Sequence, residues 1–135
     1  MDCLFCKIIE GNIPSSKVYE DMHVVAFLDI NPVHPGHTLV VPKHHSVNLF
    51  DMPEADIAAV FSAAKKIAQA VKDATGAGGI NMNMNNDKVA GQVVFHSHIH
   101  VVPRFDNDGL RLWPGRKYAA GQQDEIQKRI AGCLT

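Results

Sequence analysis

The first third of the chain alternates between apolar and polar positions in short runs that are typical of β-strands. Residues 18–29 (VYEDMHVVAFLD) hold two β-rich runs with a polar pair between them, which predicts a hairpin. Residues 31–36 (NPVHPG) contain two prolines and a glycine and predict a turn. Residues 38–41 are rich in β-branched side chains and predict a further strand that stops at Pro42.

Residues 52–75 form the one long stretch with helical periodicity. Asp51 is the expected N-cap, Glu54 lies three residues later as in a capping box, and Gly76 is expected to end the helix. A shorter helix is expected over residues 124–134. The apolar side chains that recur at the helical period of the long helix are Ile57, Val60, Phe61, Ala64, Ile67, Ala68 and Val71.

The second half of the chain adds two predicted strands. Residues 80–85 (INMNMN) alternate strictly, residues 86–91 predict a loop, and residues 92–103 predict a valine-rich strand. Most connections between strands are too short for parallel crossovers, so the sheet is predicted to be mainly antiparallel. Because no repeat, low-complexity segment or linker divides the sequence, we expect one α+β domain over residues 1–135.

Composition narrows the class of protein. Hydrophobic residues make up 46% and charged residues 20% of the 135 residues, as in an ordinary soluble protein. A formal net charge of -1 offers no broad basic field for a long nucleic acid. The N-terminus lacks the pattern of a signal peptide, and no apolar run approaches the ~20 residues of a membrane span. We therefore expect a cytoplasmic protein that binds neither a long nucleic acid nor a membrane.

Three of the eight histidines are closely spaced, at His96, His98 and His100. On a strand their side chains would project from one face, with Cα atoms roughly 6.5–7 Å apart. Three such imidazoles are costly to bury unless each is hydrogen-bonded or ligated. They can share a catalytic zinc, or one neutral imidazole can attack phosphorus. Nothing acidic between Asp87 and Asp106 can act as the base of a metal hydrolase, so the pattern favours a nucleophilic histidine.

Cys3 and Cys6 form a CxxC pair near the N-terminus. A thioredoxin-like redox pair would follow a strand and open a helix, which does not fit this position. A structural zinc site needs two further ligands. Cys133 is interpreted as an ordinary helix residue.

The segment 91–104 (GQVVFHSHIHVVPR) closely resembles the signature HφHφHφφ of the histidine-triad (HIT) family, where φ is apolar. The segments DCLFCKIIEGNIPSSKVYED and VVAFLDINPVHPGHTLVVPKHH resemble the Hint branch of that family, in matching order. The resemblance implies a mainly antiparallel five-stranded sheet with one long helix and short terminal helices. It also implies an enzyme that acts on nucleotides and works as a homodimer, with the long helix and the strand after Gly79 as the expected interface.

The resemblance implies a role for each histidine of the site. His98 is expected to attack the α-phosphate of a nucleoside phosphoramidate or dinucleoside polyphosphate, as nucleophilic catalysis by imidazole allows. His100 and His37 are expected to donate hydrogen bonds to the phosphate. For His37, a purely turn-stabilising role is the alternative.

The resemblance also implies contacts to the nucleotide. Asp29 is expected to accept hydrogen bonds from the ribose hydroxyls, with a turn cap as the alternative. Apolar side chains are expected around the base, with core packing as the equal alternative, and amides near the phosphates and sugar. These remaining candidates are Ile8, Phe27, Ile30, Asn85 and Gln92.

By the same resemblance, His45 and His96 are expected to complete a structural zinc site with Cys3 and Cys6, and His44 is the adjacent alternative to His45. Arg104 and Arg111 are interpreted as solvated surface charge, with contact to distal phosphates as the alternative. Trp113 is interpreted as an anchor of the C-terminal tail, with contact to a nucleotide site across a dimer as the alternative.

The sequence departs from the family pattern at Val93, in the substrate site, where the family usually has a polar residue. Valine cannot donate a hydrogen bond to a phosphate or leaving group. Ser97 also replaces the usual apolar residue between the first two histidines. Two alternatives to the hydrolase therefore stay open: a nucleotide-binding or partner-binding HIT module with little turnover, and a zinc-dependent hydrolase.

Overall fold

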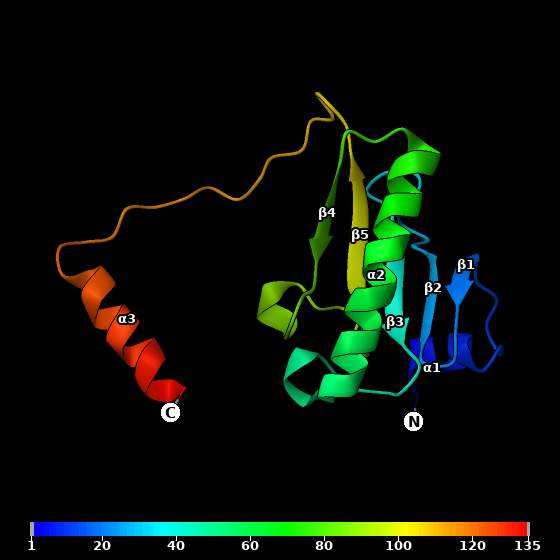
Figure 1. The fold of residues 1–135 in the computed structure, drawn as a ribbon, viewed down its shortest axis with the longest axis horizontal. Helices are drawn as coiled ribbons and strands as arrows, with labels where there is room; N and C mark the ends of the chain where they lie inside the picture. The colour runs from blue at the N-terminus through cyan, green and yellow to red at the C-terminus, as the bar shows by residue number, and fades with distance from the viewer. Residues whose placement is uncertain (1, 135) are drawn as a thin grey trace.

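The computed structural model describes residues 2–134. This part of the chain forms one five-stranded sheet in the order β1-β2-β3-β5-β4, with every neighbouring pair antiparallel (Figure 1). The strands are β1 (Lys17–Glu20), β2 (Val24–Leu28), β3 (Thr38–Pro42), β4 (Gly79–Asn83) and β5 (Ile99–Arg104). The helices are α1 (Leu4–Ile9), α2 (Glu54–Thr75) and α3 (Gln122–Cys133), with the 3₁₀ turns η1 (Leu49–Asp51) and η2 (Lys88–Ala90). The predicted α+β class, antiparallel sheet and single long helix are confirmed.

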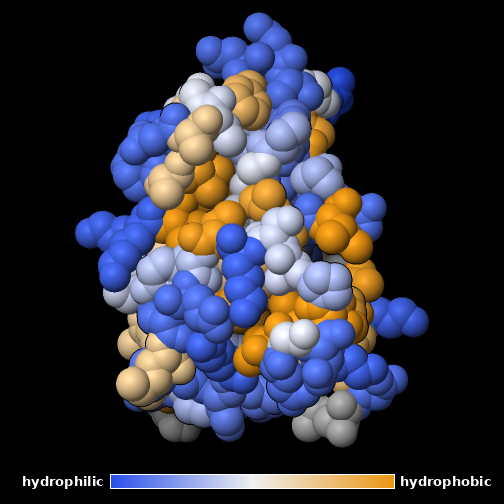
Figure 2. Space-filling view, turned by 90° about the vertical axis from the view of Figure 1, so that its right-hand side faces the viewer, coloured by the Kyte–Doolittle hydropathy of each residue, from blue (hydrophilic) through white to orange (hydrophobic). Residues whose placement is uncertain are grey.

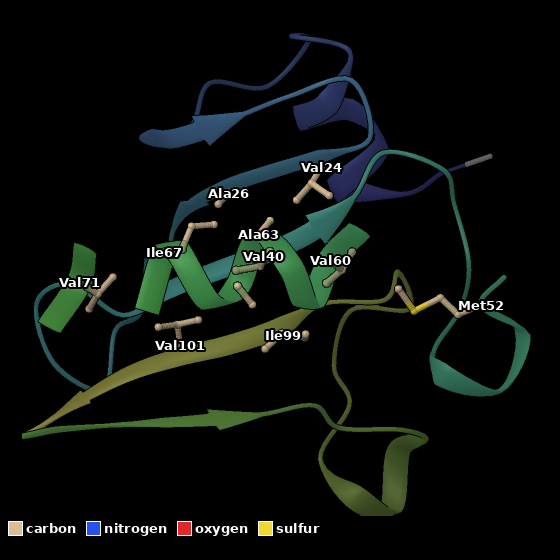
Figure 3. Close-up of a cluster of buried hydrophobic side chains, with 11 residues drawn as sticks. Val24, Ala26, Val40, Met52, Val60, Ala63, Ile67, Val71, Ile99 and Val101 are labelled. Atoms are coloured by element: carbon tan, nitrogen blue, oxygen red, sulfur yellow. The ribbon is translucent and has the colours of Figure 1, made fainter. Parts of the chain in front are cut away.

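Helix α2 covers one face of the sheet with the apolar stripe that its periodicity predicts (Figure 3). Val60, Ile67 and Val71 are buried in this stripe, whereas Phe61 is 46% exposed. Burying each large aliphatic side chain contributes roughly 1.5–3 kcal/mol, which makes this layer a main source of stability. The sheet residues packed beneath the helix are Val24, Ala26, Val40, Ile99 and Val101.

The start of α2 differs from the prediction. Its N-cap is Pro53, which makes no side-chain capping bond. Asp51 instead closes a capping box with Asn48 around η1, one turn earlier in the chain. A carboxylate that is already bonded to the amides of Val47 and Asn48 is not available to the long helix. The predicted end is confirmed, because Gly76 adopts the left-handed conformation that a helix C-cap favours.

Helix α1 covers part of the opposite face of the sheet, where a second cluster of buried side chains includes Phe5, Ile8, Val25, Phe27, Leu39 and Val41. Side chains alternate along a strand, so Ile99 and Val101 point to α2 while His98 and His100 point to the α1 side. The face that carries the histidines is therefore the face covered by α1.

The last predicted strand is shorter than expected, since β5 begins at Ile99 rather than at residue 92. Side chains replace the strand ladder over the preceding residues. The side-chain Nε2 atom of Gln92 donates to the carbonyl oxygens of Val47 and Val94. The hydroxyls of Ser46 and Ser97 lie 2.7 Å apart. These local bonds hold residues 92–98 in an irregular path that still brings the histidines to one face.

The C-terminal segment leaves the sheet beside its β4 edge and carries α3 away from the rest of the chain (Figure 1). None of the residues of α3 is buried, and both Ile130 and Trp113 are exposed. The interpretation of Trp113 as a tail anchor is therefore wrong for this chain, since its side chain is 93% exposed.

The opposite side of the molecule, where β1 forms the edge of the sheet, presents apolar side chains in patches separated by polar ones (Figure 2). Within residues 2–134, no helix combines the length and the apolar character that crossing a membrane requires.

Candidate active site and metal centre

His98 lies directly before β5 and is 7% exposed. Its Nδ1 lies 2.6 Å from the carbonyl oxygen of His96, a group that can only accept a hydrogen bond. The Nδ1 atom of neutral His98 therefore carries the proton and donates it to that carbonyl. The Nε2 atom is left with a free lone pair, which is the form that a nucleophilic imidazole needs.

The neighbouring imidazoles of His37 and His100 are fixed in the opposite tautomer. The backbone amide of Val33 donates to Nδ1 of His37 at 3.1 Å, so His37 carries its proton on Nε2. That Nε2 lies 2.9 Å from Nδ1 of His100 and donates to it. His100 consequently carries its proton on Nε2, as a donor. His98 and His100, whose ring centroids are 4.9 Å apart, thus present a lone pair and an N–H side by side.

Burial keeps these imidazoles neutral. It lowers the pKa of His98 below the ordinary histidine value, and the carbonyl of His96 and the charge of Asp29 offset this only in part. Burial, followed by the neighbouring His98 and His37, lowers the pKa of His100 to about 4. Burial also lowers the pKa of His37, against the opposing charge of Asp29. At neutral pH these three imidazoles are therefore uncharged.

Asp29 follows β2 and lies beside His37, with one carboxylate oxygen 3.6 Å from the Nε2 atom of His37. Its other oxygen accepts from the amide of Asn31 at 2.8 Å, so the turn-cap interpretation holds for that oxygen. The carboxylate is partly exposed and remains within reach of a ligand. Its position close to the His37–His100 pair agrees with the expected ribose contact, which stays a prediction.

The other candidates for nucleotide contact are placed differently from one another. Phe27 and Ile8 are buried in the cluster between α1 and the sheet, as the core-packing alternative expects. Ile30 and Val93 are 90% and 84% exposed. The side chain of Gln92 is buried and bonded to loop backbone, so it acts here as a brace of the segment before His96. Their contacts to a nucleotide stay predictions.

Asn85 is partly buried, and its amide donates to the carbonyl of Gly91 at 3.4 Å. Beyond His100, the same face of the sheet continues into a hollow of about 550 Å³ that lies between β4, β5 and the start of the C-terminal segment. Asn83 pairs with His100 and Asn81 with Val102 across the two strands, which places this hollow next to the histidines. The side chains around it include Asn81, Asn83, Val102, Arg104, Arg111 and Trp113.

A second group of side chains lies at the other end of the histidine segment. Cys3 is the N-cap of α1 and Cys6 lies one turn later, so both sulfurs face the same end of the helix. The Sγ atoms of Cys3 and Cys6 lie 3.4 and 3.6 Å from Nδ1 of His96, and Nδ1 of His45 lies 3.1 Å from that same atom. The predicted ligands of a zinc site are thus brought together.

The spacing of these atoms fits zinc. Bonds of about 2.3 Å to sulfur and 2.0–2.1 Å to nitrogen in a tetrahedron separate S–N pairs by about 3.6 Å and N–N pairs by about 3.3 Å. The Nε2 atom of His96 lies 2.8 Å from the carbonyl of Pro42, so it is the protonated nitrogen and leaves Nδ1 as a ligand. His44 is bonded to Asp56 at 3.0 Å and is not part of this group. His45 rather than His44 is therefore the fourth member.

Arg104, His34 and Asp108 form a bonded group near the site that the sequence did not predict. The interpretation of Arg104 as solvated charge is wrong, because its guanidinium is paired with Asp108 at 2.7 Å. His34 also contacts Asp108, at 3.2 Å. Neither the turn at residues 31–36 nor the sequence DNDG at residues 106–109 predicts the contact between His34 and Asp108, which lie 74 residues apart in the chain.

A model of the HIT domain matches residues 10–107. The chain belongs to the HIT family. This HIT protein is 45% identical over 133 residues to the adenylylsulfatase HINT3 of Arabidopsis thaliana, covering 98% of this chain and 68% of that one. It is 38% identical over 134 residues to the adenosine 5'-monophosphoramidase HNT1 of Saccharomyces cerevisiae, covering 98% and 82%.

Solved structures agree with this assignment. A member of the HIT family from Bacillus subtilis superposes with a TM-score of 0.92 at 44% identity, over 100% of this chain and 99% of the other. A Zn-bound histidine triad family protein from Mycobacterium smegmatis superposes with a TM-score of 0.78 at 38% identity, over 98% of both chains. The expected family and fold are confirmed.

Proposed function

We propose that this HIT protein hydrolyses nucleoside phosphoramidates or dinucleoside polyphosphates, with His98 as the nucleophile. The observation that carries the proposal is the contact between the Nδ1 atom of His98 and the carbonyl of His96, which leaves the Nε2 lone pair free at neutral pH. Relatives named as an adenylylsulfatase and an adenosine 5'-monophosphoramidase support a substrate that contains a nucleoside 5'-phosphate.

The reaction divides into two displacements at the α-phosphorus. The Nε2 lone pair of His98 forms a bond to phosphorus while the bond from phosphorus to the leaving group breaks. The leaving group departs with the electron pair of that bond and takes up a proton from solvent. Water then attacks the histidine-bound phosphorus, gives up a proton to solvent and releases the nucleoside monophosphate, and the electron pair of the P–N bond returns to His98. Each step has a lower barrier than a single attack by water.

His100 supports both steps as a hydrogen-bond donor. Its Nε2–H is available because Nδ1 accepts from His37. A donor that is fixed before the substrate arrives stabilises the charge that develops on the phosphoryl oxygens without further reorganisation. Asp29 is proposed to bind the ribose hydroxyls, with Ile8, Phe27 and Ile30 near the base and Asn85, Gln92 and Val93 near the phosphate.

Cys3, Cys6, His45 and His96 are proposed to hold a structural zinc ion. Four protein ligands leave no open position for water or substrate, so the metal supplies stability rather than a nucleophile. It would tie the start of α1 to the segment that carries His98. Two thiolate ligands also suit a reducing compartment, which agrees with the proposed cytoplasmic location.

We further propose that the chain is a single HIT domain that forms a homodimer. The free side of β4 at the edge of the sheet and the exposed C-terminal segment beyond it support an interface at this edge. Sedimentation equilibrium tests the proposal. Twice the mass of one chain at micromolar concentration supports it, and the mass of one chain contradicts it.

The enzymatic proposal is tested by incubating the protein with adenosine 5'-phosphoramidate and, separately, with diadenosine polyphosphates. AMP release is followed by chromatography. We expect turnover of at least one substrate and a loss of at least about a thousandfold in His98→Ala. His23→Ala is the matched control, since His23 is exposed in the β1–β2 turn. No turnover of either substrate by a folded protein that binds AMP would favour the nucleotide-binding module instead.

A further inference from the structure

Asp108 is the centre of a partly buried polar cluster next to the site. Its side chain is only 5% exposed and lies in the loop after β5. One carboxylate oxygen accepts from Nε2 of His34 at 3.2 Å and from Nε of Arg104 at 2.7 Å. The other accepts from a second nitrogen of Arg104 at 3.0 Å and from the amide of Leu110 at 3.1 Å. Both oxygens are therefore held by more than one donor.

One branch of this cluster leads to His37. The backbone carbonyl of His34 accepts from the amide of His37 at 3.0 Å, and the amide of Val33 donates to the ring of His37. The ring of His34 also packs edge-on against Phe105, with centroids 5.3 Å apart. A bond from Asp108 to His34 thus fixes the turn whose backbone sets the orientation and tautomer of His37.

The other branch leads to His100. Arg104 lies on β5, four residues after His100 and on the same face of the strand. Its guanidinium also donates to Asn81 on β4 at 2.7 Å. A single carboxylate is therefore bonded to the turn that carries His37 and to the strand that carries His100.

The chemistry of the cluster requires a carboxylate at this position. Every group that contacts Asp108 is a donor, and the adjacent guanidinium holds the pKa of that carboxyl well below its usual range. An ionised carboxylate has only acceptor sites, whereas an amide of the same shape would turn an NH₂ group towards these donors. Charge-assisted bonds of this kind are roughly twice as strong as neutral ones.

We propose that Asp108 is a positioning residue that holds His37 and His100 in their hydrogen-bonded pair by joining His34 to Arg104. It touches neither the reacting atoms nor the nucleophile. Its contribution to turnover rests on the proposed function, whereas its effect on the histidine pair does not.

The test compares Asp108→Asn with Asp106→Asn, a matched loss of an exposed carboxylate two residues earlier. The first readout is the ring ¹⁵N spectrum of His37 and His100. We expect one Nε2–H tautomer for each ring in the wild type and in Asp106→Asn, and mixed tautomers for His37 in Asp108→Asn. Unchanged ring signals in a folded Asp108→Asn protein overturn the proposal.

The second readout is turnover. Because small displacements of a catalytic group cost rate rather than affinity, we expect kcat to fall between about tenfold and a hundredfold in Asp108→Asn with KM changed less than about threefold. A purely structural role lowers the melting temperature and leaves kcat of the folded protein unchanged, which also overturns the proposal. If the wild type shows no turnover, the proposed function fails, and the ring spectra still decide the role of Asp108.

His34→Phe separates the branch through His34 from general stability, because it keeps the ring against Phe105 and removes only the bond to Asp108. We expect His34→Phe to give the same mixed tautomers of His37 as Asp108→Asn. Combining the two substitutions is expected to leave the ring signals of His37 as they are in Asp108→Asn alone. Additive effects on kcat contradict a path through His34. If Asp108→Asn does not fold, the ring ¹⁵N spectrum of His34→Phe alone tests the proposal, and unchanged His37 signals in that variant overturn it.

Discussion

The carbonyl oxygen of His96 lies 2.6 Å from Nδ1 of His98, while the ring of His96 belongs to the cysteine–histidine cluster. One residue therefore serves two sites: its backbone sets the tautomer of the proposed nucleophile, and its ring is a proposed zinc ligand. The Nε2 contact to Pro42 leaves the Nδ1 atom of that ring facing the cysteines, as the second role requires. Loss of the metal is therefore expected to displace His96, and with it the carbonyl that orients the ring of His98.

Replacing Cys6 by serine is expected to abolish zinc binding. The variant loses one thiolate of the four-ligand set, so we expect the metal content to fall from about one zinc per chain to a small fraction of that. The melting temperature is expected to drop with it, since binding free energy at a structural site adds to folding free energy. Atomic emission analysis and thermal unfolding measure the two effects.

The matched control for this prediction is His44→Asn. His44 lies next to the proposed ligand His45 but is bonded to Asp56, so its loss is expected to leave the zinc content unchanged. A zinc content that falls in His44→Asn, or that survives in Cys6→Ser, would show that the metal is held by other residues.

The pH dependence of His100 follows from its burial. Its pKa is lowered to about 4, below the ~6.5 of an unfolded histidine. A group whose pKa falls on folding contributes stability that is fully present above the unfolded value and is lost as the pH drops through the folded value. We expect an NMR titration midpoint near pH 4 for its ring proton, and a smaller loss of stability between about pH 6.5 and 4 in His100→Asn. A midpoint above 6.5 would contradict the buried, neutral assignment.

Val93→Ser is expected to raise the rate with poor leaving groups. The valine is exposed beside the histidine segment and offers no donor. A new hydrogen bond worth about 0.5–1.5 kcal/mol in the transition state corresponds to a rate increase of roughly two- to tenfold. The ratio of kcat/KM for a phosphoramidate and a dinucleoside polyphosphate measures the effect. An unchanged ratio would exclude Val93 from leaving-group selection.

Ile67→Ala tests the packing of α2 independently of the site. Ile67 is 4% exposed on the face of α2 that packs on the sheet, and truncation of such a side chain costs about 2–5 kcal/mol of unfolding free energy. Phe61→Ala on the same helix removes a side chain that is 46% exposed and is expected to cost less than half as much. Urea unfolding of both variants checks the order, and equal losses would contradict the assigned buried face.

The elements of this fold could be predicted because local periodicity and tertiary packing agree. The apolar spacing of α2, the hairpin before Asp29 and the alternation that puts His98 and His100 on one face are all local properties. The proposed zinc ligands could be predicted only from the family resemblance, because the sequence spacing of Cys3, Cys6 and His45 does not indicate that they lie close together.

The errors arise where side chains bond to backbone or to distant segments. Asp51 has the sequence position of a cap for α2, but it caps η1 because the turn at Asn48 offers it two amides. The strand predicted to begin at residue 92 begins instead at Ile99, because the side chain of Gln92 bonds to loop carbonyls and holds the preceding residues out of the sheet. Asp108 was missed because one of its partners, His34, lies 74 residues away and comes close only in the folded chain.

The central claim is that His98 forms a covalent bond to phosphorus, and the mass of the intact protein tests it most directly. The protein is mixed with adenosine 5'-phosphoramidate, quenched in the first turnovers and weighed beside His98→Ala and His23→Ala. We predict an added adenylyl group on the wild type and on His23→Ala, and none on His98→Ala. An adduct that survives in His98→Ala, or turnover by the wild type with no adduct at any quench time, would contradict the account.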